Sequence, residues 1–166
     1  MIKYGHLDID VRGAKLAQIK FQDLHECYRQ YEQLDAYYNK QNSSIWQMFD
    51  DDCPNWVWQM ASRLLESLNE SPNYVVSIVR IDPGNTIPNH VDAHFKVQEK
   101  HGKGKTARYL IMLEDWKSGH YYEIHNQPYI KWRKGDWTLF GSDDWHLAGN
   151  MGDEPFYSMQ VTVKYD

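Results

Sequence analysis

The stretch YVVSIVRIDPGNTIPNHVD, residues 74–92, decides the fold of this chain. Its first eight residues are a nearly continuous run of β-branched and aromatic side chains, which is typical of a strand. Pro83-Gly84 then predicts a tight turn, and residues 86–92 predict a second strand. Because side chains alternate along a strand with period two, His90 and Asp92 are expected to share one face at the mouth of a β structure.

The same strand signals continue to the end of the sequence. They predict eight strands in all, at 74–81, 86–92, 107–113, 120–125, 129–132, 136–140, 145–150 and 156–165. Short strands with tight turns, preceded by helices, indicate a mainly β fold with a jelly-roll or double-stranded β-helix core. We expect a single domain over residues 1–166, with 1–72 as a helical support region and 73–166 as the β-helix core.

The residues before this core carry apolar side chains at mostly helical spacing. They predict one helix over 15–38, and a second that starts near Asp52-Cys53-Pro54, runs through Leu68 and stops before Pro72. Between them, residues 39–51 form a polar and aromatic loop. We leave open whether this loop is a lid or only a connection.

Composition narrows the function classes. With 166 residues, 42% hydrophobic and 25% charged, the chain can bury one core. No apolar run approaches the roughly 18 residues of a membrane helix, so we expect a soluble, cytoplasmic protein with no membrane partner. The net charge is −5, and the short basic run 100–105 is expected to be a solvated loop, which argues against nucleic acid. Cys27 and Cys53 lack metal-type or redox-type spacing.

A candidate metal site joins the two ends of the predicted core. His146, in the segment Ser142-Asp143-Asp144-Trp145-His146, opens a predicted strand. Together with His90 and Asp92 it supplies two imidazoles and one carboxylate, the set that holds non-haem iron and leaves other positions open. The His-x-Asp spacing alone is weak, since about one is expected by chance in this composition. His94, four residues after His90, is a competing ligand.

Two longer spacings carry a resemblance to a known family. The first is Pro83-Gly84, five residues and His90, and the second is Trp132, two residues, Gly135, four residues, Phe140, five residues and His146. Together they resemble the Fe(II)- and 2-oxoglutarate-dependent oxygenases, and in motif spacing they are most similar to the aspartyl/asparaginyl β-hydroxylase group. The resemblance covers about half of the chain.

The resemblance implies an enzyme that uses Fe(II), 2-oxoglutarate and O₂ to hydroxylate a C–H bond, with a protein or peptide side chain as the substrate class. His90, Asp92 and His146 would hold the iron. Asp92 is a departure from the β-hydroxylase group, which commonly lacks this carboxylate, and it restores a prolyl-hydroxylase-like triad.

A second departure concerns the co-substrate. The family usually has an Arg or Lys about ten residues after the distal histidine to pair with the far carboxylate of 2-oxoglutarate, and here that position is Phe156. Arg108 lies where the family has another 2-oxoglutarate-binding arginine, and we expect it to take the role because a guanidinium can hold a carboxylate through two hydrogen bonds. Arg80 is the second choice. On this view Arg108→Ala leaves iron binding nearly intact.

Two other classes of protein stay open. Gly84, five residues and His90, with His146, three residues and Asn150, also fit loose cupin spacings. A metal-binding cupin would act on or bind a small molecule without 2-oxoglutarate, and an inward-facing arginine beside the metal would argue against it. A purely structural module would leave the coincidence of three ligands and two turn motifs unexplained. The sequence fixes neither the substrate nor the oligomeric state.

Overall fold

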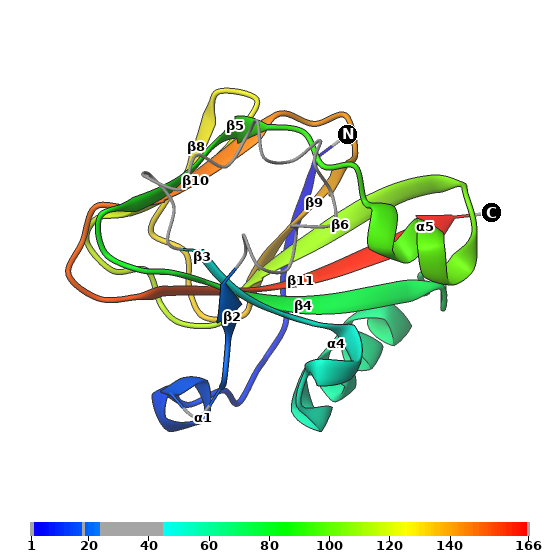
Figure 1. The fold of residues 1–166 in the computed structure, drawn as a ribbon, viewed down its shortest axis with the longest axis horizontal. Coiled ribbons are helices and arrows are strands. Elements are labelled where there is room, and N and C mark those ends of the chain that lie inside the picture. The colour runs from blue at the N-terminus through cyan, green and yellow to red at the C-terminus, as the bar shows by residue number, and fades with distance from the viewer. Residues whose placement is uncertain (1, 18, 24–44, 166) are drawn as a thin grey trace.

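The chain folds into two antiparallel β-sheets that face each other, as the computed structural model in Figure 1 shows. The structure describes residues 2–17, 19–23 and 45–165. The strands and their order are those of a double-stranded β-helix, so the predicted fold class is confirmed.

The larger sheet has seven strands and the smaller one has four. In spatial order, the larger sheet contains β1 (Lys3–His6), β9 (Asp136–Gly141), β6 (Lys105–Met112), β11 (Phe156–Tyr165), β4 (Tyr74–Ile81), β3 (Ile45–Phe49) and β2 (Gln22–Asp23). The smaller sheet contains β5 (Asn85–His90), β10 (His146–Asn150), β7 (His120–Ile124) and β8 (Gln127–Tyr129).

The predicted turn at Pro83-Gly84 carries the chain from one sheet to the other. Gly84 has φ +79°, a conformation that costs little only for glycine, and its N–H donates to Asn150 O at 2.8 Å. The turn therefore connects β4 of the larger sheet to β5 of the smaller sheet. This connection brings His90, at the end of β5, to the rim of the space between the sheets.

The larger sheet is buried on both faces. Along β4, Val76 and Ile78 belong to a core cluster outside the barrel, whereas Val79 and Ile81 belong to a second cluster between the sheets. Helix α4 (Asn55–Leu68) packs on the outer face, and Figure 1 shows it below β4. Alternate side chains of one strand thus enter two separate cores.

The second predicted helix is confirmed. Its buried residues recur at helical spacing: Val57, Met60, Ala61, Leu64 and Leu65. Pro54 occupies the N-cap position without a capping hydrogen bond, and Asn69, in the left-handed conformation with φ 52°, ends the helix. A 3₁₀ turn, Asp50–Asp52, precedes it. In the described part of the chain, no helix is both long enough and apolar enough to cross a membrane.

The first predicted helix is confirmed only over residues 15–17, which belong to helix α1 (Gly13–Ala17). It is wrong at Gln22–Asp23, which form β2 and pair with β3 at the sheet edge. Residues 24–38 of the prediction lie outside the described residues. Helical spacing is a weak signal beside the backbone pairing that an open sheet edge offers.

Two further expectations about the first 72 residues need correction. Residues 45–49 of the predicted loop form strand β3, which pairs with β4; residues 39–44 lie outside the described range. Residues 3–6 form β1, which pairs with β9. The boundary between a helical support region and a β-helix core at residue 72 is therefore wrong, because both segments extend the larger sheet.

A short helix was also missed after His90 and Asp92, the first two candidate metal ligands. Strand β5 ends at His90, two residues earlier than predicted, and α5 (Phe95–His101) follows. Lys100 and His101 of the basic run belong to this helix, and Lys100 pairs with Asp50 at 2.6 Å. In Figure 1, α5 covers one end of the larger sheet beside β4 and β11, which it contacts.

Candidate metal centre

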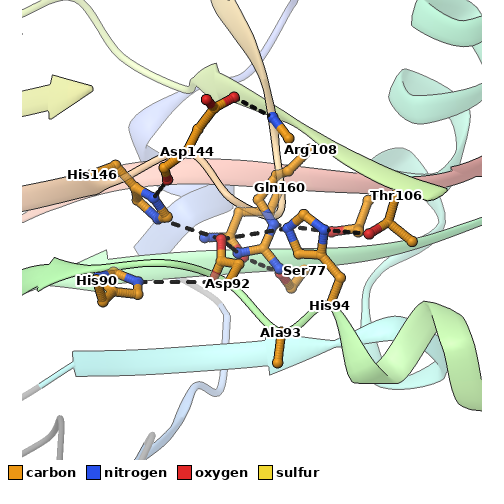
Figure 2. Close-up of polar contacts among 12 residues, drawn as sticks. Ser77, His90, Asp92, Ala93, His94, Thr106, Arg108, Asp144, His146 and Gln160 are labelled. Atoms are coloured by element: carbon orange, nitrogen blue, oxygen red, sulfur yellow. Dashed lines mark hydrogen bonds and ion pairs between the residues drawn. The ribbon is translucent and has the colours of Figure 1, made fainter. Parts of the chain in front are cut away.

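The three predicted metal ligands come together at one end of the smaller sheet. His146, the first residue of β10, lies directly opposite His90, the last residue of β5, and their ring centroids are 4.3 Å apart. Asp92 follows two residues after His90. One ligand atom from each of these residues lies within 4.8 Å of the other two. Figure 2 shows both imidazoles directed toward Asp92.

Both histidines are oriented by main-chain carbonyls. The Nδ1 atom of His90 lies 2.7 Å from Pro88 O, and the Nδ1 atom of His146 lies 2.9 Å from Asp144 O. A carbonyl oxygen only accepts, so the hydrogen of each neutral ring is on Nδ1 and the Nε2 lone pair is left for a metal. This donor set fits a divalent transition metal.

Asp92 is a buried carboxylate that keeps its negative charge. Burial raises its pKa, but Arg108 and the neighbouring imidazoles outweigh this and hold the pKa well below its usual range. The Nη1 atom of Arg108 lies 2.6 Å from Asp92 Oδ2, and the Nε2 atom of His146 lies 3.3 Å from the same oxygen. A charged carboxylate is the form that binds a cation.

Arg108 points into the barrel beside the three candidate ligands. Its Nε donates to Thr162 Oγ1 at 3.0 Å, and its Nη1 donates to Asp92. The expected inward-facing arginine is therefore present. Its contact with Asp92 changes the expectation for Arg108→Ala, because removing the guanidinium would leave the carboxylate of this candidate ligand buried without its main counter-charge.

The structure does not bring Arg80 to this group. Side chains of β4 alternate, and Arg80 lies on the outer face with Ile78, whereas Ser77 lies on the inner face. Its Nε pairs with Asp82 at 2.9 Å, and its guanidinium lies 5.3 Å from the centre of the Phe21 ring.

The two arginine–aspartate pairs on opposite faces of the larger sheet allow a matched stability test. In metal-free protein, Asp92→Asn and Arg108→Met should each cost about 3–5 kcal/mol of unfolding free energy, because each leaves a buried charge without its partner. The double variant should cost less than the sum by about 1–3 kcal/mol. Urea unfolding with a chelator measures both quantities.

The control for that cycle is Asp82→Asn with Arg80→Met. This pair is 25% and 29% exposed, so the coupling should be only about 0.2–1 kcal/mol. Equal coupling in the two cycles would mean that the Asp92–Arg108 pair is no more than an ordinary surface ion pair.

Phe156 occupies the position at which the resemblance predicts an Arg or Lys that pairs with the far carboxylate of 2-oxoglutarate. Its ring stacks on His120 at 5.0 Å and on Trp132 at 5.1 Å between centroids. The Nε2 atom of His120 lies 3.0 Å from Glu154 O. An aromatic stack thus fills this end of the barrel interior. Phe156, which replaces the Arg or Lys expected from the resemblance, is part of that packed core.

A cavity of about 60 Å³ opens beside the candidate ligands. His90, Asp92 and Arg108 line it, together with polar and apolar groups that include Ser77, His94, Lys96, Thr162 and Phe49. Phe49 and Asp50 belong to the segment that we left as a lid or a connection, so the described end of that segment borders the cavity.

His94 is the third imidazole near Asp92, but it is not among the grouped ligands. Its side chain is fully buried, its Nδ1 lies 2.9 Å from Thr106 Oγ1, and its Nε2 lies 3.5 Å from Asp92 Oδ2. Burial lowers the pKa of His94 and Arg108 lowers it further, which favours the neutral ring.

The loop before His146 is held by Asp144, a role that the sequence analysis missed. Its Oδ2 accepts the Gly141 N–H at 2.7 Å, and its Oδ1 pairs with His125 Nε2 at 2.5 Å. Burial raises the pKa of Asp144, but His125 outweighs it and the pKa is lowered. Asn150, in contrast, donates to Ile81 O and Glu154 O and so holds a turn rather than His146.

Two buried hydroxyls were also missed. Tyr122 and Thr138 each place a hydroxyl in the interior, where the two side chains are neighbours and neither hydroxyl has a well-formed hydrogen bond among the described residues. Burial raises the pKa of Tyr122 well above its usual value, and its ring lies 6.3 Å from that of His146. A buried hydroxyl without a well-formed hydrogen bond is costly, so Tyr122 marks a polar position near His146.

Comparison with solved structures supports the fold. A prolyl-4-hydroxylase from Pseudomonas putida matches with a TM-score of 0.59 and 13% identity, covering 99% of this chain and 92% of that one. KdgF from a Halomonas species matches with a TM-score of 0.50 and 9% identity, covering 90% of both chains. No protein-family model matches the sequence, and no curated protein matches it.

At these identities the likeness shows the fold alone. The chain is a double-stranded β-helix protein of the jelly-roll or cupin type, and it carries a His-Asp-His group that could hold a metal ion.

Proposed function

We propose that this protein is an Fe(II)- and 2-oxoglutarate-dependent dioxygenase that hydroxylates a C–H bond, with a protein or peptide side chain as its substrate. The observation that carries the proposal is the convergence of two Nε2 lone pairs and a charged carboxylate next to an inward-facing arginine. We further propose that residues 1–166 act as one oxygenase domain, since strands from both ends of the chain complete the larger sheet.

Each residue around the cavity has a distinct task. His90, Asp92 and His146 would hold iron, which with 2-oxoglutarate and O₂ supplies the oxidising power to hydroxylate a C–H bond. Pro88 O and Asp144 O keep the Nε2 lone pairs directed at the metal. The sheets and α5 surround these residues and limit access of water.

Arg108 is the residue that we assign to the co-substrate. A guanidinium has five N–H donors, of which one reaches Thr162 and another reaches Asp92, so it can hold a ligand carboxylate while it keeps these contacts. A buried dicarboxylate without a cation would be costly, and Phe156 supplies none.

A metal-binding cupin that acts on or binds a small molecule is the second candidate. The aromatic stack of Phe156, His120 and Trp132 favours it, because it occupies the end of the interior where a far carboxylate anchor is expected. The contact of Arg108 with Asp92 favours it too, since the guanidinium is already engaged with a metal ligand.

Co-substrate turnover separates the two candidates. Purified protein with Fe(II), ascorbate, 2-oxoglutarate and a peptide-rich lysate should release succinate and give products that are one oxygen heavier by mass spectrometry. His146→Gln should give neither. Metal binding without succinate, with or without added peptide, would favour the cupin candidate over the dioxygenase.

A further inference from the structure

Three imidazoles surround the Asp92 carboxylate, and their hydrogen-bond partners divide them into two kinds. His90 and His146 have Nδ1 on main-chain carbonyls, which only accept. His94 has Nδ1 on the Thr106 hydroxyl, which can donate. The ring nitrogen that faces Asp92 is Nε2 in all three.

We propose that His94 is a positioning residue that keeps its hydrogen on Nε2 and donates it to Asp92 Oδ2. Together with Arg108 it reserves this oxygen, so that Asp92 offers only Oδ1 to the metal. The inference rests on the proposed metal centre, and it explains why His94 faces the same carboxylate as the two ligand histidines without being a ligand itself.

The tautomer follows from the partner of Nδ1, because Nε2 faces the same carboxylate in all three histidines. A neutral imidazole carries one hydrogen, and a hydroxyl can donate to the bare nitrogen of the ring. Thr106, a buried residue, can therefore donate to Nδ1 of His94 and leave the hydrogen of that ring on Nε2. In His90 and His146 the carbonyls impose the opposite tautomer and leave Nε2 bare, as metal ligation requires.

Burying His94 costs free energy unless its Nε2 makes a hydrogen bond. The atom is buried and has no hydrogen-bond partner among the described residues, and it lies 3.5 Å from Asp92 Oδ2. A movement of about 0.5 Å brings the pair to a normal N–H···O distance. The backbone of His94 is also in the left-handed region, with φ 48°, which is uncommon for residues other than glycine.

The consequence concerns the number of positions left on the metal. Arg108 Nη1 lies 2.6 Å from Oδ2, and His94 Nε2 lies 3.5 Å from the same oxygen. Of the two candidate ligand histidines, His146 also faces Oδ2, at 3.3 Å, whereas His90 faces Oδ1, at 3.7 Å. With Oδ2 engaged by two donors, Asp92 would bind through one oxygen. Without His94, Oδ2 is freer to turn toward the metal and take a position that would otherwise hold water or co-substrate.

Mn(II) can serve as the probe, because its affinity and its number of exchangeable water ligands are both measurable by water-proton relaxation. The informative pair is His94→Asn and His94→Gln. The asparagine amide nitrogen matches the place of Nδ1 and suits the left-handed backbone, whereas the glutamine amide nitrogen matches the place of Nε2 and can still donate to Asp92.

We expect His94→Asn to bind Mn(II) about 10- to 100-fold more weakly than the wild type, with fewer exchangeable waters, as for other outer partners of metal ligands. His94→Gln should recover most of the Mn(II) affinity and most of the exchangeable waters. Thr106→Val, which removes the donor to Nδ1 with little change in shape, should give an intermediate loss. His101→Asn, at the C-terminal end of the helix that His94 precedes and in contact with Tyr74 O, should behave as the wild type.

Circular dichroism and thermal unfolding establish whether each variant folds. If His94→Asn does not fold, Thr106→Val tests the same hydrogen-bond chain in its place. Wild-type affinity and water number in both His94→Asn and Thr106→Val would overturn the role of His94, and so would equal losses in His94→Asn and His94→Gln. If the wild type binds no Mn(II), the proposed metal centre itself fails.

Discussion

Replacing Asp92 with alanine is expected to weaken Fe(II) or Mn(II) binding by more than roughly 100-fold, since it removes the carboxylate of the ligand set and outer partners alone are worth about 10–100-fold. The change also leaves Arg108, 2.6 Å away, as a buried positive charge beside the two bare Nε2 atoms, which repels a cation. Anaerobic calorimetry measures the affinity.

Asp82→Ala is the matched control for this prediction. Asp82 also pairs with an arginine, but on the outer side of the larger sheet, so its loss should leave metal affinity unchanged. Asp92→Ala should also weaken binding more than either His94 variant. Wild-type affinity in Asp92→Ala would exclude the His90, Asp92 and His146 group as the metal centre.

The second large effect concerns Arg108 and 2-oxoglutarate. With Mn(II) held at saturation, Arg108→Met should weaken 2-oxoglutarate binding by roughly 30- to 5,000-fold, the equivalent of about 2–5 kcal/mol for a buried charged pair that loses one partner. Arg108→Lys should recover only part of this, because an ammonium cannot reproduce the two parallel bonds of a guanidinium. Calorimetry with 2-oxoglutarate provides the affinities.

Arg80→Met is the control, since Arg80 lies on the outer face of β4 and pairs with Asp82. It should bind 2-oxoglutarate as the wild type does. Metal affinity must be measured separately in Arg108→Met, because this arginine also contacts Asp92. Unchanged 2-oxoglutarate affinity in Arg108→Met, or no binding even in the wild type, would support the cupin candidate.

The sequence was informative where a local pattern coincides with a local structure. Strands 74–81 and 156–165 were predicted with the bounds that the structure has, because runs of β-branched and aromatic residues end at clear turn signals. The helix that ends at Leu68 shows helical periodicity over its whole length. Residue type and spacing were enough to single out His90, Asp92 and His146. The pairing of β5 with β10 then brings His90 and His146 close together.

The sequence was less informative where a long-range partner decides the structure. β1 has no strong strand signal of its own, and it forms because β9, more than 130 residues later, offers an edge to pair with. The same holds for β3, whose partner β4 organises a segment that reads as a loop. Residues 22–23 pair with β3 for the same reason, although the sequence pattern in this segment predicts a helix.

By itself, then, the sequence determined the β-helix class and the identity of the candidate ligands, since both follow from side-chain chemistry and short spacings. Only the tertiary structure decided which arginine, Arg108 or Arg80, lies beside the candidate ligands. β4 is apolar on both faces, so alternation cannot tell whether Arg80 points in or out. In the folded chain Arg80 lies on the outer face of β4 with Ile78 and pairs with Asp82. The register of β6 with β11 instead places Arg108 opposite Thr162, and its guanidinium donates to Thr162 and Asp92.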